Sequence, residues 1–423
     1  MISSIDHLAQ RLIGEFGADA ISTDAASLAA HAVDGQLANI ICRPSSAAEV
    51  AACLRLCGEA QAVAAPWGGG TAMALGNPPR RLDVIIDLQR LGRVTDHDPG
   101  NLTVTAQSGI KLAKLQGALA HDKQFAPFDP PLPARATIGG TIAANINGPR
   151  RSSFGAARDL VIGMKVALAN GEQIKAGGKV VKNVAGYDMC KLFVGSLGTL
   201  GIITEVTVRV APLAESAVTV LASGNLVEMT ALIDVIGRSS LLPVALVLVN
   251  DSRETMWRLG IRCEGFAPTV ARYRRDLAAM AQAIGVATEI LVDHAHANFW
   301  NGIDNFPLAP DRLIFRLTVP RAAIAALIKT IEEPGTALVA DVVAGTLWLA
   351  YETTMPTAER FGRLHALASQ YHGHVVLFAA PAELKRGVEV WGATPSTFSL
   401  LREIKRQFDP QGLLNPGRYV GGL

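Results

Sequence analysis

The sequence lacks the charge imbalance that is typical of nucleic-acid-binding and membrane-surface proteins. Its 39 basic and 37 acidic residues leave a formal net charge of +2 at pH 7, with no long run of like charges. We therefore do not expect nucleic acid or an anionic membrane to be the main partner. Only 18% of the residues are charged and 49% are hydrophobic, so the 423-residue chain resembles a globular protein with a large core, not a disordered one.

Cysteine is also scarce, and the sequence contains neither a signal peptide pattern nor a long apolar run. The five cysteines are odd in number and lack the spacing of metal ligands, so we predict buried, reduced thiols. The start of the chain, MISSIDHLAQRL, has no basic stretch followed by an apolar one. Apolar runs such as LLPVALVLV are shorter than the ~20 residues needed to span a bilayer. We expect a cytoplasmic protein that is at most peripheral on the inner membrane, through a partner.

Hydrophobic patterning in the first half of the chain predicts alternating strands and helices. Residues 43–60 predict a helix with a capping box of Ser46 and Glu49 and with Cys53 and Cys57 on one face. Strands are expected in 61–66, 82–88, 101–109 and 202–210, and a helix in 110–122. Residues 161–177 predict a hairpin with a type I′ turn at Asn170-Gly171.

The sequence pattern changes beyond about residue 215, where the glycine clusters end. Strands are expected in 244–250 and 346–352, and helices in 271–285, 357–371 and 399–408. Within the first half, residues 125–158 form a long loop-rich tract, and loops of that length are usually functional. The pattern predicts a separate α+β cap domain after the first domain.

The stretch APWGGGTAMA, at Ala65–Ala74, contains three consecutive glycines. Such a loop can expose backbone N–H groups as a nest for a phosphate. A nucleotide-hydrolysing P-loop would need a lysine here, but Thr71 follows Gly70, and the dinucleotide fingerprint G-x-G-x-x-G is absent too. Taken alone, the triplet is equally consistent with a tight structural turn.

Two further tracts combine glycine with small residues. TIGGTIAANING, at Thr137–Gly148, has a Gly-Gly pair and two asparagines, and GSLGTLGIITE, at Gly195–Glu205, leads into a strand. The alternatives are a tightly packed helix start for the former and an ordinary turn for the latter. Three such tracts together favour a site for a flat or anionic ligand.

The order of these segments carries a family resemblance. The run RPSSAAEV, PWGGGT, TIGGTIAANING, GSLGTLGIITEV and DPQGLLNPGRY resembles the vanillyl-alcohol-oxidase/PCMH-type flavoproteins, and within them the branch acting on D-2-hydroxy acids. KVVKNVAGYD and the short length resemble the glycolate oxidase E-type subunit, which accompanies a larger D-type flavoprotein and an iron–sulfur subunit. The resemblance implies an α+β chain with a two-subdomain PCMH-type FAD-binding domain (1–214), an α+β cap domain (215–395) and a C-terminal segment (396–423) that returns to the FAD domain.

The resemblance also implies which residues hold the cofactor. The glycine loop would cradle the FAD pyrophosphate, the second tract would contact the pyrophosphate and flavin, and the third would meet the adenine end. The residues implied are Pro66, Trp67, Gly68, Gly69, Gly70, Thr71, Ala72, Thr137, Ile138, Gly139, Gly140, Thr141, Ala143, Ala144, Gly148, Gly198, Gly201 and Ile202. Relatives that tether FAD covalently use a histidine beside this loop, whereas this chain has Thr71, so we predict non-covalent FAD.

The substrate machinery of catalytic relatives is not found in the sequence. They carry an H-x-G-D-G-N-x-H motif and a later E-H-G segment in the cap, associated with a divalent metal. The histidine pairs His294/His296 and His372/His374 lack the Gly-Asp-Gly-Asn interior. We predict no metal site and assign no catalytic residue, with the alternative of a metal pair formed by His372 and His374 on alternate strand positions.

The sequence thus predicts an FAD-binding subunit of a glycolate oxidase complex that supports oxidation of glycolate or a related D-2-hydroxy acid to the 2-oxo acid. The expected partners are the D-type flavoprotein, the iron–sulfur subunit and the small hydroxy acid. One alternative is a stand-alone FAD oxidoreductase with substrate groups among Arg150, Arg151, Arg158 and Tyr187. For Arg158 an ion pair with Asp159 remains open, and for Tyr187 a core position. The other alternative is an assembly scaffold with a vestigial flavin site.

Overall fold

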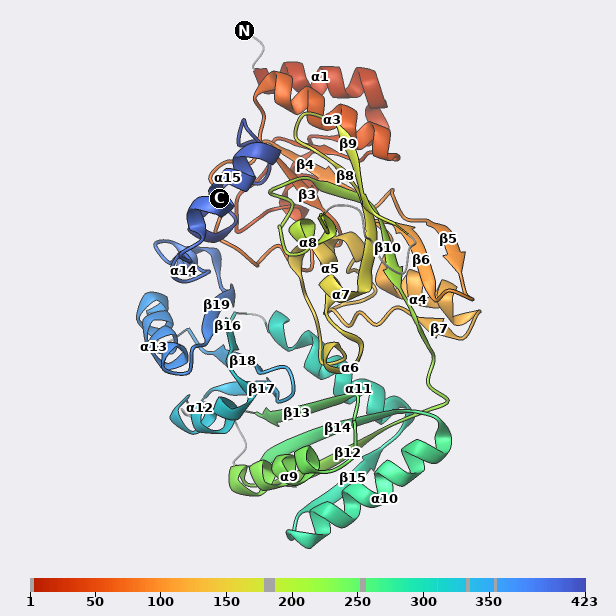
Figure 1. Cartoon of the computed structure of the whole chain (residues 1–423). Coiled ribbons are helices and arrows are strands. Elements are labelled where there is room, and N and C mark those ends of the chain that lie inside the picture. Colours follow the sequence, from red (N-terminus) through yellow and green to blue (C-terminus); the bar gives the residue numbers. More distant parts are fainter. Residues whose placement is uncertain (1–3, 179–186, 252–255, 310, 332–334, 354–355) are drawn as a thin grey trace. The chain divides into compact units, whose positions relative to one another are not determined.

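The computed structural model describes residues 4–178, 187–251, 256–309, 311–331, 335–353 and 356–423 (Figure 1). The chain divides into two compact units. Unit 1 comprises Met1–Asn147, Ala156–Ala211 and Glu389–Leu423, and unit 2 comprises Gly148–Gly155 and Pro212–Val388. Helices and strands mix in both units, which confirms the α+β class. The sequence-based boundaries after residues 214 and 395 remain a proposal.

The first sheet of unit 1 is small and mostly parallel. Its order is β1-β2-β4-β3, with β1 at Ile21–Ser22, β2 at Ile40–Cys42, β3 at Ala64–Trp67 and β4 at Val84–Asp87. β2 and β3 both pair with β4 in parallel. The neighbouring helices are α1 (Ser4–Phe16), α2 (Ala25–Ala30) and α3 (Ala47–Ala60), with a 3-10 turn at Ala18–Ala20. The predicted strands of 61–66 and 82–88 are confirmed as β3 and β4.

Helix α3 begins at the predicted cap. The Ser46 hydroxyl accepts a hydrogen bond from the Glu49 amide at 3.1 Å, but the Glu49 carboxylate accepts from the amide of Ser45 at 2.7 Å. The predicted reciprocal capping box is therefore displaced by one residue. Cys53 and Cys57 lie on the buried face of α3, and all five cysteines are buried and free, as predicted.

The second sheet of unit 1 is antiparallel, with the order β5-β6-β10-β8-β9. These strands are β5 (Val94–Asp98), β6 (Thr103–Gln107), β8 (Val161–Ala167), β9 (Gln173–Gly177) and β10 (Ile202–Arg209). A separate strand pair joins β7 (Gln124–Phe125) to β11 (Ala211–Pro212). The helices nearby are α4 (Leu112–Ala120), α5 (Ile138–Ala144), α7 (Ala157–Leu160) and α8 (Cys190–Phe193). One hydrophobic core includes Leu115, Ile142, Val166, Phe193 and Val206, so it joins this sheet to α4, α5 and α8.

The predicted hairpin of 161–177 is present as β8 and β9, but its turn type was predicted wrongly. Gly171 has a φ of +82°, whereas Asn170 is absent from the residues with positive φ. A type I′ turn needs positive φ at both central residues. The Gly171 amide instead donates to the carbonyl of Leu168 at 2.9 Å, and the Glu172 amide donates to the Asn170 side chain at 2.9 Å. The loop is a three-residue connection with glycine at its left-handed position.

Unit 2 is built on one eight-stranded sheet with the order β15-β12-β14-β13-β17-β18-β16-β19. The strands are β12 (Ser216–Gly224), β13 (Ala245–Asn250), β14 (Trp257–Gly265), β15 (Ala287–Leu291), β16 (Leu313–Thr318), β17 (Ala337–Asp341), β18 (Thr346–Tyr351) and β19 (His374–Ala379). The helices are α6 (Arg151–Phe154), α9 (Leu226–Arg238), α10 (Ala267–Ala283), α11 (Asp293–Asn305), α12 (Ile324–Ile331), α13 (Thr357–Gln370) and α14 (Ala382–Lys385), with 3-10 turns at Phe306–Leu308 and Arg321–Ala323.

The two faces of this sheet are covered differently. Figure 1 shows α9 and α10 on one side and α11 on the other. Trp300 and Ile303 of α11 pack against Ala245, Val247 and Val339 of the sheet, and we call this side the α11 face. The strands and helices predicted between residues 244 and 371 are confirmed. Unit 1 ends with α15 (Phe398–Phe408), also predicted, and a 3-10 turn at Val420–Gly422.

No helix within the described ranges is long and apolar enough to cross a lipid bilayer. Most of the KVVKNVAGYD stretch, residues 179–186, lies outside the described residues, so the structure says nothing of that motif.

Candidate functional site

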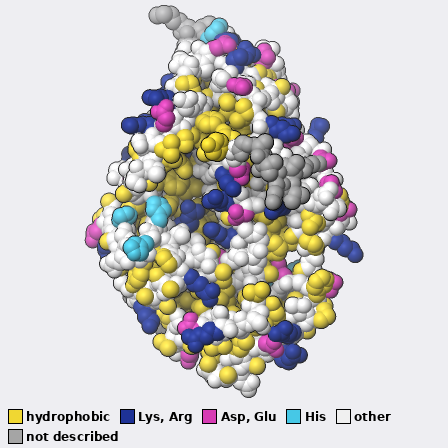
Figure 2. Space-filling view, in the orientation of Figure 1, with side chains coloured by type: hydrophobic (Ala, Val, Ile, Leu, Met, Phe, Trp, Pro, Cys, Tyr) yellow, Lys and Arg dark blue, Asp and Glu magenta, His cyan; other side chains and the backbone are white. Residues whose placement is uncertain are grey.

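A cleft in unit 1 brings the three glycine tracts together. Its empty space is about 820 Å³, part of it open to solvent. Figure 2 shows hydrophobic side chains gathered over the region of β3 and β4. The predicted cofactor residues that line the cleft are Pro66, Trp67, Gly68, Gly69, Gly70, Thr71, Ala72, Thr137, Gly139, Gly140, Thr141, Ala143, Ala144, Gly198, Gly201 and Ile202. Ile138 is instead buried in the core, and Gly148 belongs to unit 2.

The first tract needs its glycines because it packs closely against the segment before α5. A Cβ atom on Gly68 would overlap the hydroxyl of Thr137, and one on Gly69 would overlap the carbonyl oxygen of Arg135. Gly70 has a φ of +70°, a conformation that glycine adopts without strain. The structural interpretation of the triplet is therefore correct. It is compatible with binding, because the same packing leaves the loop backbone bare along the cleft.

The second tract is the start of helix α5. Thr137 is its N-cap, and its hydroxyl accepts a hydrogen bond from the Gly140 amide at 3.3 Å. The second tract is therefore a tightly packed helix start, which was the alternative interpretation of its sequence. Gly139 packs on Ser108, where a Cβ atom would lie 2.5 Å from the serine Cβ. Gly140 has more room, since only the Thr137 hydroxyl lies near, 3.0 Å from an added Cβ.

The third tract meets the first. Gly198 has a φ of +70°, and a Cβ atom there would overlap the ring of Pro66. Buried Lys405 of α15 holds this tract from behind by donating to the carbonyl of Thr199 at 2.8 Å and to Asp409 at 2.6 Å. Burial lowers the pKa of Lys405, and the Asp409 carboxylate partly offsets this effect. The C-terminal helix therefore fixes one wall of the cleft.

Sequence reasoning missed seven residues that line the cleft. They are Met73, Leu88, Ile146, Leu197, Ile203, Asn415 and Arg418. Arg418 is almost fully buried and donates to Asp34 at 2.8 Å and to the carbonyls of Met73 at 2.7 Å and Leu75 at 2.6 Å. It thereby braces the chain that follows the glycine loop. The NPGRY sequence carried part of the family resemblance and was the signal that pointed to this segment.

Asn415 and Arg418 also supply polar atoms to the cleft. The Asn415 amide nitrogen donates to the carbonyl of Leu197 at 2.7 Å, whereas its buried oxygen has no hydrogen-bond partner in the described part of the chain. The same holds for the Nε atom of Arg418. Buried polar atoms are normally hydrogen-bonded, so these two are available to a ligand.

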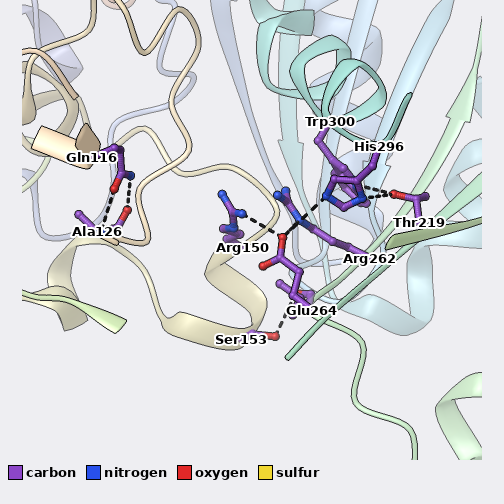
Figure 3. A network of polar contacts seen from close by, with 10 residues as sticks. Gln116, Ala126, Arg150, Ser153, Thr219, Arg262, Glu264, His296 and Trp300 are labelled. Atoms are coloured by element: carbon purple, nitrogen blue, oxygen red, sulfur yellow. Dashed lines mark hydrogen bonds and ion pairs between the residues drawn. The ribbon is translucent and has the colours of Figure 1, made fainter. Parts of the chain in front are cut away.

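Unit 2 carries a separate network of buried polar side chains on the α11 face (Figure 3). Arg150 and Arg262 both point toward Glu264, with 2.9 Å between Arg150 Nη2 and the carboxylate. The hydroxyl of Thr219 lies 2.9 Å from His296 Nδ1 and accepts from the Trp300 indole at 2.8 Å. The ion pair between Arg150 and Glu264 ties the segment Gly148–Gly155 to the sheet of unit 2.

The charges of this network are largely compensated within it. Burial would raise the pKa of Glu264, but Arg262 and Arg150 outweigh it and hold that pKa below its ordinary value. Burial, and then Arg262, lowers the pKa of His296 to about 4, so this histidine is neutral at pH 7. Glu264 is therefore an ionised structural partner of both arginines.

The other candidates from the sequence lie apart from one another. Arg158 is exposed, and Asp159 accepts from the Ala156 amide at 3.0 Å, so the alternative ion pair is not formed. Tyr187 is 92% exposed, which excludes a core position. His372 lies in a turn with a φ of +55°, and His374 begins β19. Figure 2 shows histidine side chains over α13 and β19, but no group of three potential metal ligands occurs among the residues that the structure describes.

Comparison with known proteins identifies the family of the chain. A family model for an FAD binding domain matches residues 38–177, and one for the C-terminal domain of FAD linked oxidases matches residues 391–419. The glycolate oxidase subunit GlcE of Escherichia coli is 30% identical over 337 residues, which cover 78% of this chain and 85% of GlcE. The chain belongs to the FAD-linked oxidase family. FAD is its cofactor, and its activity class is oxidoreductase.

Other relatives of this FAD-linked oxidase match over most of its length. The glycolate oxidase subunit GlcD of Bacillus subtilis is 28% identical and covers 89% of the chain and 87% of GlcD. The D-lactate dehydrogenase of Archaeoglobus fulgidus is 27% identical, with 91% and 92% coverage. Among solved structures, p-cresol methylhydroxylase superposes with a TM-score of 0.75 at 14% identity, covering 98% of this chain and 96% of its own. That likeness shows the fold alone.

The cleft residues fit a flavin dinucleotide. Backbone amides of Gly68, Gly69 and Gly70 suit a diphosphate, because bared N–H groups bind anions without a cationic side chain. The apolar side chains of Trp67, Leu88 and Ile203 suit flat rings, and the open oxygen of Asn415 suits an N–H donor. That the residues named from sequence bind FAD remains a prediction. So does non-covalent binding, with Thr71 in place of a tethering histidine.

Proposed function

We propose that this FAD-linked oxidase is the E-type subunit of a complex that oxidises glycolate, or a related D-2-hydroxy acid, to the 2-oxo acid. The observation that carries the proposal is the similarity to GlcE over 85% of that relative. A second support is the absence from the sequence of the H-x-G-D-G-N-x-H motif by which catalytic relatives are recognised. The proposed partners are a D-type flavoprotein and an iron–sulfur subunit.

In this function the cleft of unit 1 holds the cofactor and shields it from water. When bound, FAD would accept the electrons that oxidation of the hydroxy acid releases. The glycine loop would hold the diphosphate through its amides, with Gly140 beside it in the wall of the cleft. Arg418 would keep the loop in place, since it fixes the carbonyls of Met73 and Leu75.

Reduction of the purified chain, with and without its partners, tests the proposal. We expect a yellow protein that glycolate or D-lactate leaves oxidised under anaerobic conditions, and whose flavin is reduced once the D-type and iron–sulfur subunits are added. Affinity purification from the native cell extract should recover both partners. Rapid bleaching of the isolated chain by glycolate would contradict the dependent-subunit proposal.

A second candidate is a stand-alone FAD-dependent hydroxy-acid dehydrogenase. It is favoured by the match to the Archaeoglobus fulgidus D-lactate dehydrogenase across 92% of that relative. The same anaerobic experiment distinguishes the two, since only a stand-alone enzyme bleaches without partners. A colourless protein that cannot take up FAD would instead indicate the scaffold alternative.

A further inference from the structure

The α11 face of unit 2 carries a second pair of arginines, at a distance along the sheet from the Glu264 network. Arg316 lies on β16 opposite Trp348 of β18, and Thr346, two residues earlier on β18, lies opposite Asp341 of β17. Side chains two residues apart on a strand share a face. Val339 pairs with Trp348 and packs with α11, which places all four side chains on the α11 face. By strand spacing, the Cα atoms of Arg316 and Asp341 are roughly 12 Å apart.

Arg316 is held by aromatic rings instead of a carboxylate. Its guanidinium carbon lies 5.8 Å from the ring centroid of Trp348 and 5.9 Å from that of Phe378. In the described part of the chain the Arg316 side chain makes no hydrogen bond and no ion pair. It is surrounded by protein atoms yet keeps part of its surface open. Burial and Arg151 lower the pKa of Arg316 to about 10, so it stays cationic at pH 7.

Arg151 brings a second positive charge to the same place. It is the first residue of α6 and is exposed, and it interacts electrostatically with both Arg316 and Asp341. The next residue, Ser152, is tied to Asp341, with its hydroxyl 3.4 Å from each carboxylate oxygen. The two like charges repel each other, and the nearby Asp341 carboxylate, whose pKa burial raises to about 6, is not bonded to either arginine within the described ranges. We call Arg151, Arg316 and Thr346 the arginine niche.

Thr346 gives an independent sign that the niche takes a ligand. Its side chain is 93% buried, since 7% of its surface is exposed. Its hydroxyl has no hydrogen-bond partner within the described ranges. Such an orphaned hydroxyl costs free energy unless a ligand or water satisfies it. Of the other polar groups facing this region, His374 is kept neutral by burial and by Arg316, which lower its pKa.

The two arginine clusters of unit 2 differ in what they can bind. Arg150 and Arg262 share the Glu264 carboxylate, so an incoming anion would have to displace it. Arg316 and Arg151 have no such carboxylate bonded to them, and planar guanidinium groups match a carboxylate in shape and charge. We propose that the arginine niche of unit 2 binds the carboxylate of a small hydroxy acid, with the Thr346 hydroxyl as an additional hydrogen-bond donor. This inference rests on the proposed function and adds that this subunit, not only its partner, binds the substrate class.

Binding of oxalate to the flavin-loaded full chain tests the inference. Oxalate carries the carboxylate but has no C–H bond to give up as hydride, so binding is separated from reduction. We expect saturable calorimetric binding together with a change in tryptophan fluorescence, because Trp348 flanks Arg316. Arg316→Gln and Arg151→Gln should each weaken binding by tenfold or more, since each removes a charge-assisted hydrogen bond. Arg274→Gln is the matched control, because Arg274 is an exposed arginine of α10.

The outcomes separate the inference from the proposed function. Equal oxalate affinity in Arg316→Gln and the parent chain would overturn the inference, as would sulfate that displaces oxalate at equal affinity. If Arg316→Gln does not fold, Arg151→Gln decides, since Arg151 is exposed on the surface. A colourless chain that still binds oxalate through Arg316 would refute the flavin-dependent function and support the niche. A yellow chain that binds no oxalate would refute the niche and leave the flavin-dependent function standing.

Discussion

Replacement of Gly140 by glutamate should weaken FAD binding about 100-fold. The position lines the cleft at the start of α5, and an added Cβ has only the Thr137 hydroxyl near it, at 3.0 Å. The fold can accept the side chain if the Thr137 hydroxyl shifts by a few tenths of an ångström. A carboxylate about 6 Å from a phosphate charge costs roughly 3 kcal/mol at an effective dielectric of 20. Solvent screening reduces this, and the second phosphate adds to it, so we take about 2.7 kcal/mol, or 100-fold.

Three variants isolate this charge effect. Gly140→Gln has the same shape without the charge and should lose much less affinity. Gly117→Glu adds the same charge in α4, where nothing lies within 4 Å of an added Cβ, and should bind FAD as the parent does. Titration of the flavin-free proteins with FAD, followed by flavin fluorescence, gives the three dissociation constants. If Gly140→Glu and Gly117→Glu bind FAD equally well, the diphosphate does not lie at the start of α5.

Three further predictions concern buried charges. Glu264→Gln should lower the free energy of unfolding, measured by urea titration, by about 3–5 kcal/mol, because it removes the carboxylate shared by the buried Arg262 and the half-buried Arg150. Asp188→Asn is the control, because it removes an exposed ion pair with Lys191 and should lower the free energy of unfolding by less than about 1 kcal/mol. Equal losses in Glu264→Gln and Asp188→Asn would contradict this prediction. Lys405→Met should cost about 3 kcal/mol and lower FAD affinity, and an unchanged melting temperature would argue against its role behind the cleft. Burial raises the pKa of Asp341 to about 6, above its value of about 3.8 when unfolded, so the native state holds the proton more tightly and loses stability as pH rises through this window. Relative to Asp341→Asn, the parent chain should lose about 1.4 kcal/mol between pH 5 and pH 7.5, and parallel stability profiles of the two proteins would contradict this.

Much of the fold could be predicted because its signals are local. The helix at 43–60 carries its N-cap beside its apolar face, and α13 and β18 show clear periodicities. The glycine tracts were recognisable for the same reason, since each is a short run of residues. The turn at Asn170 shows the limit of local rules, because the extra loop residue selected another turn type than the Asn-Gly pair suggested.

The rest of the site depends on contacts between distant parts of the chain. Arg418 bonds to Asp34 across 384 residues, and Arg150 meets Glu264 across 114. The NPGRY motif marks the segment of Arg418 but not its partner Asp34. Nothing in the sequence around Arg150 points to Glu264. Only the sheet register of unit 2 shows that Arg262 is compensated by Glu264 while Arg316 lies against Trp348.

The bracing of the glycine loop by Arg418 has a consequence for the order of events during biosynthesis. The loop emerges early from the ribosome, but the guanidinium that holds Met73 and Leu75 is made more than three hundred residues later. A nascent chain that stops short of α15 also lacks Lys405 behind the third tract. We therefore expect flavin loading to follow translation of this last segment, and truncation within it to weaken cofactor uptake while the residues of the glycine loop remain present.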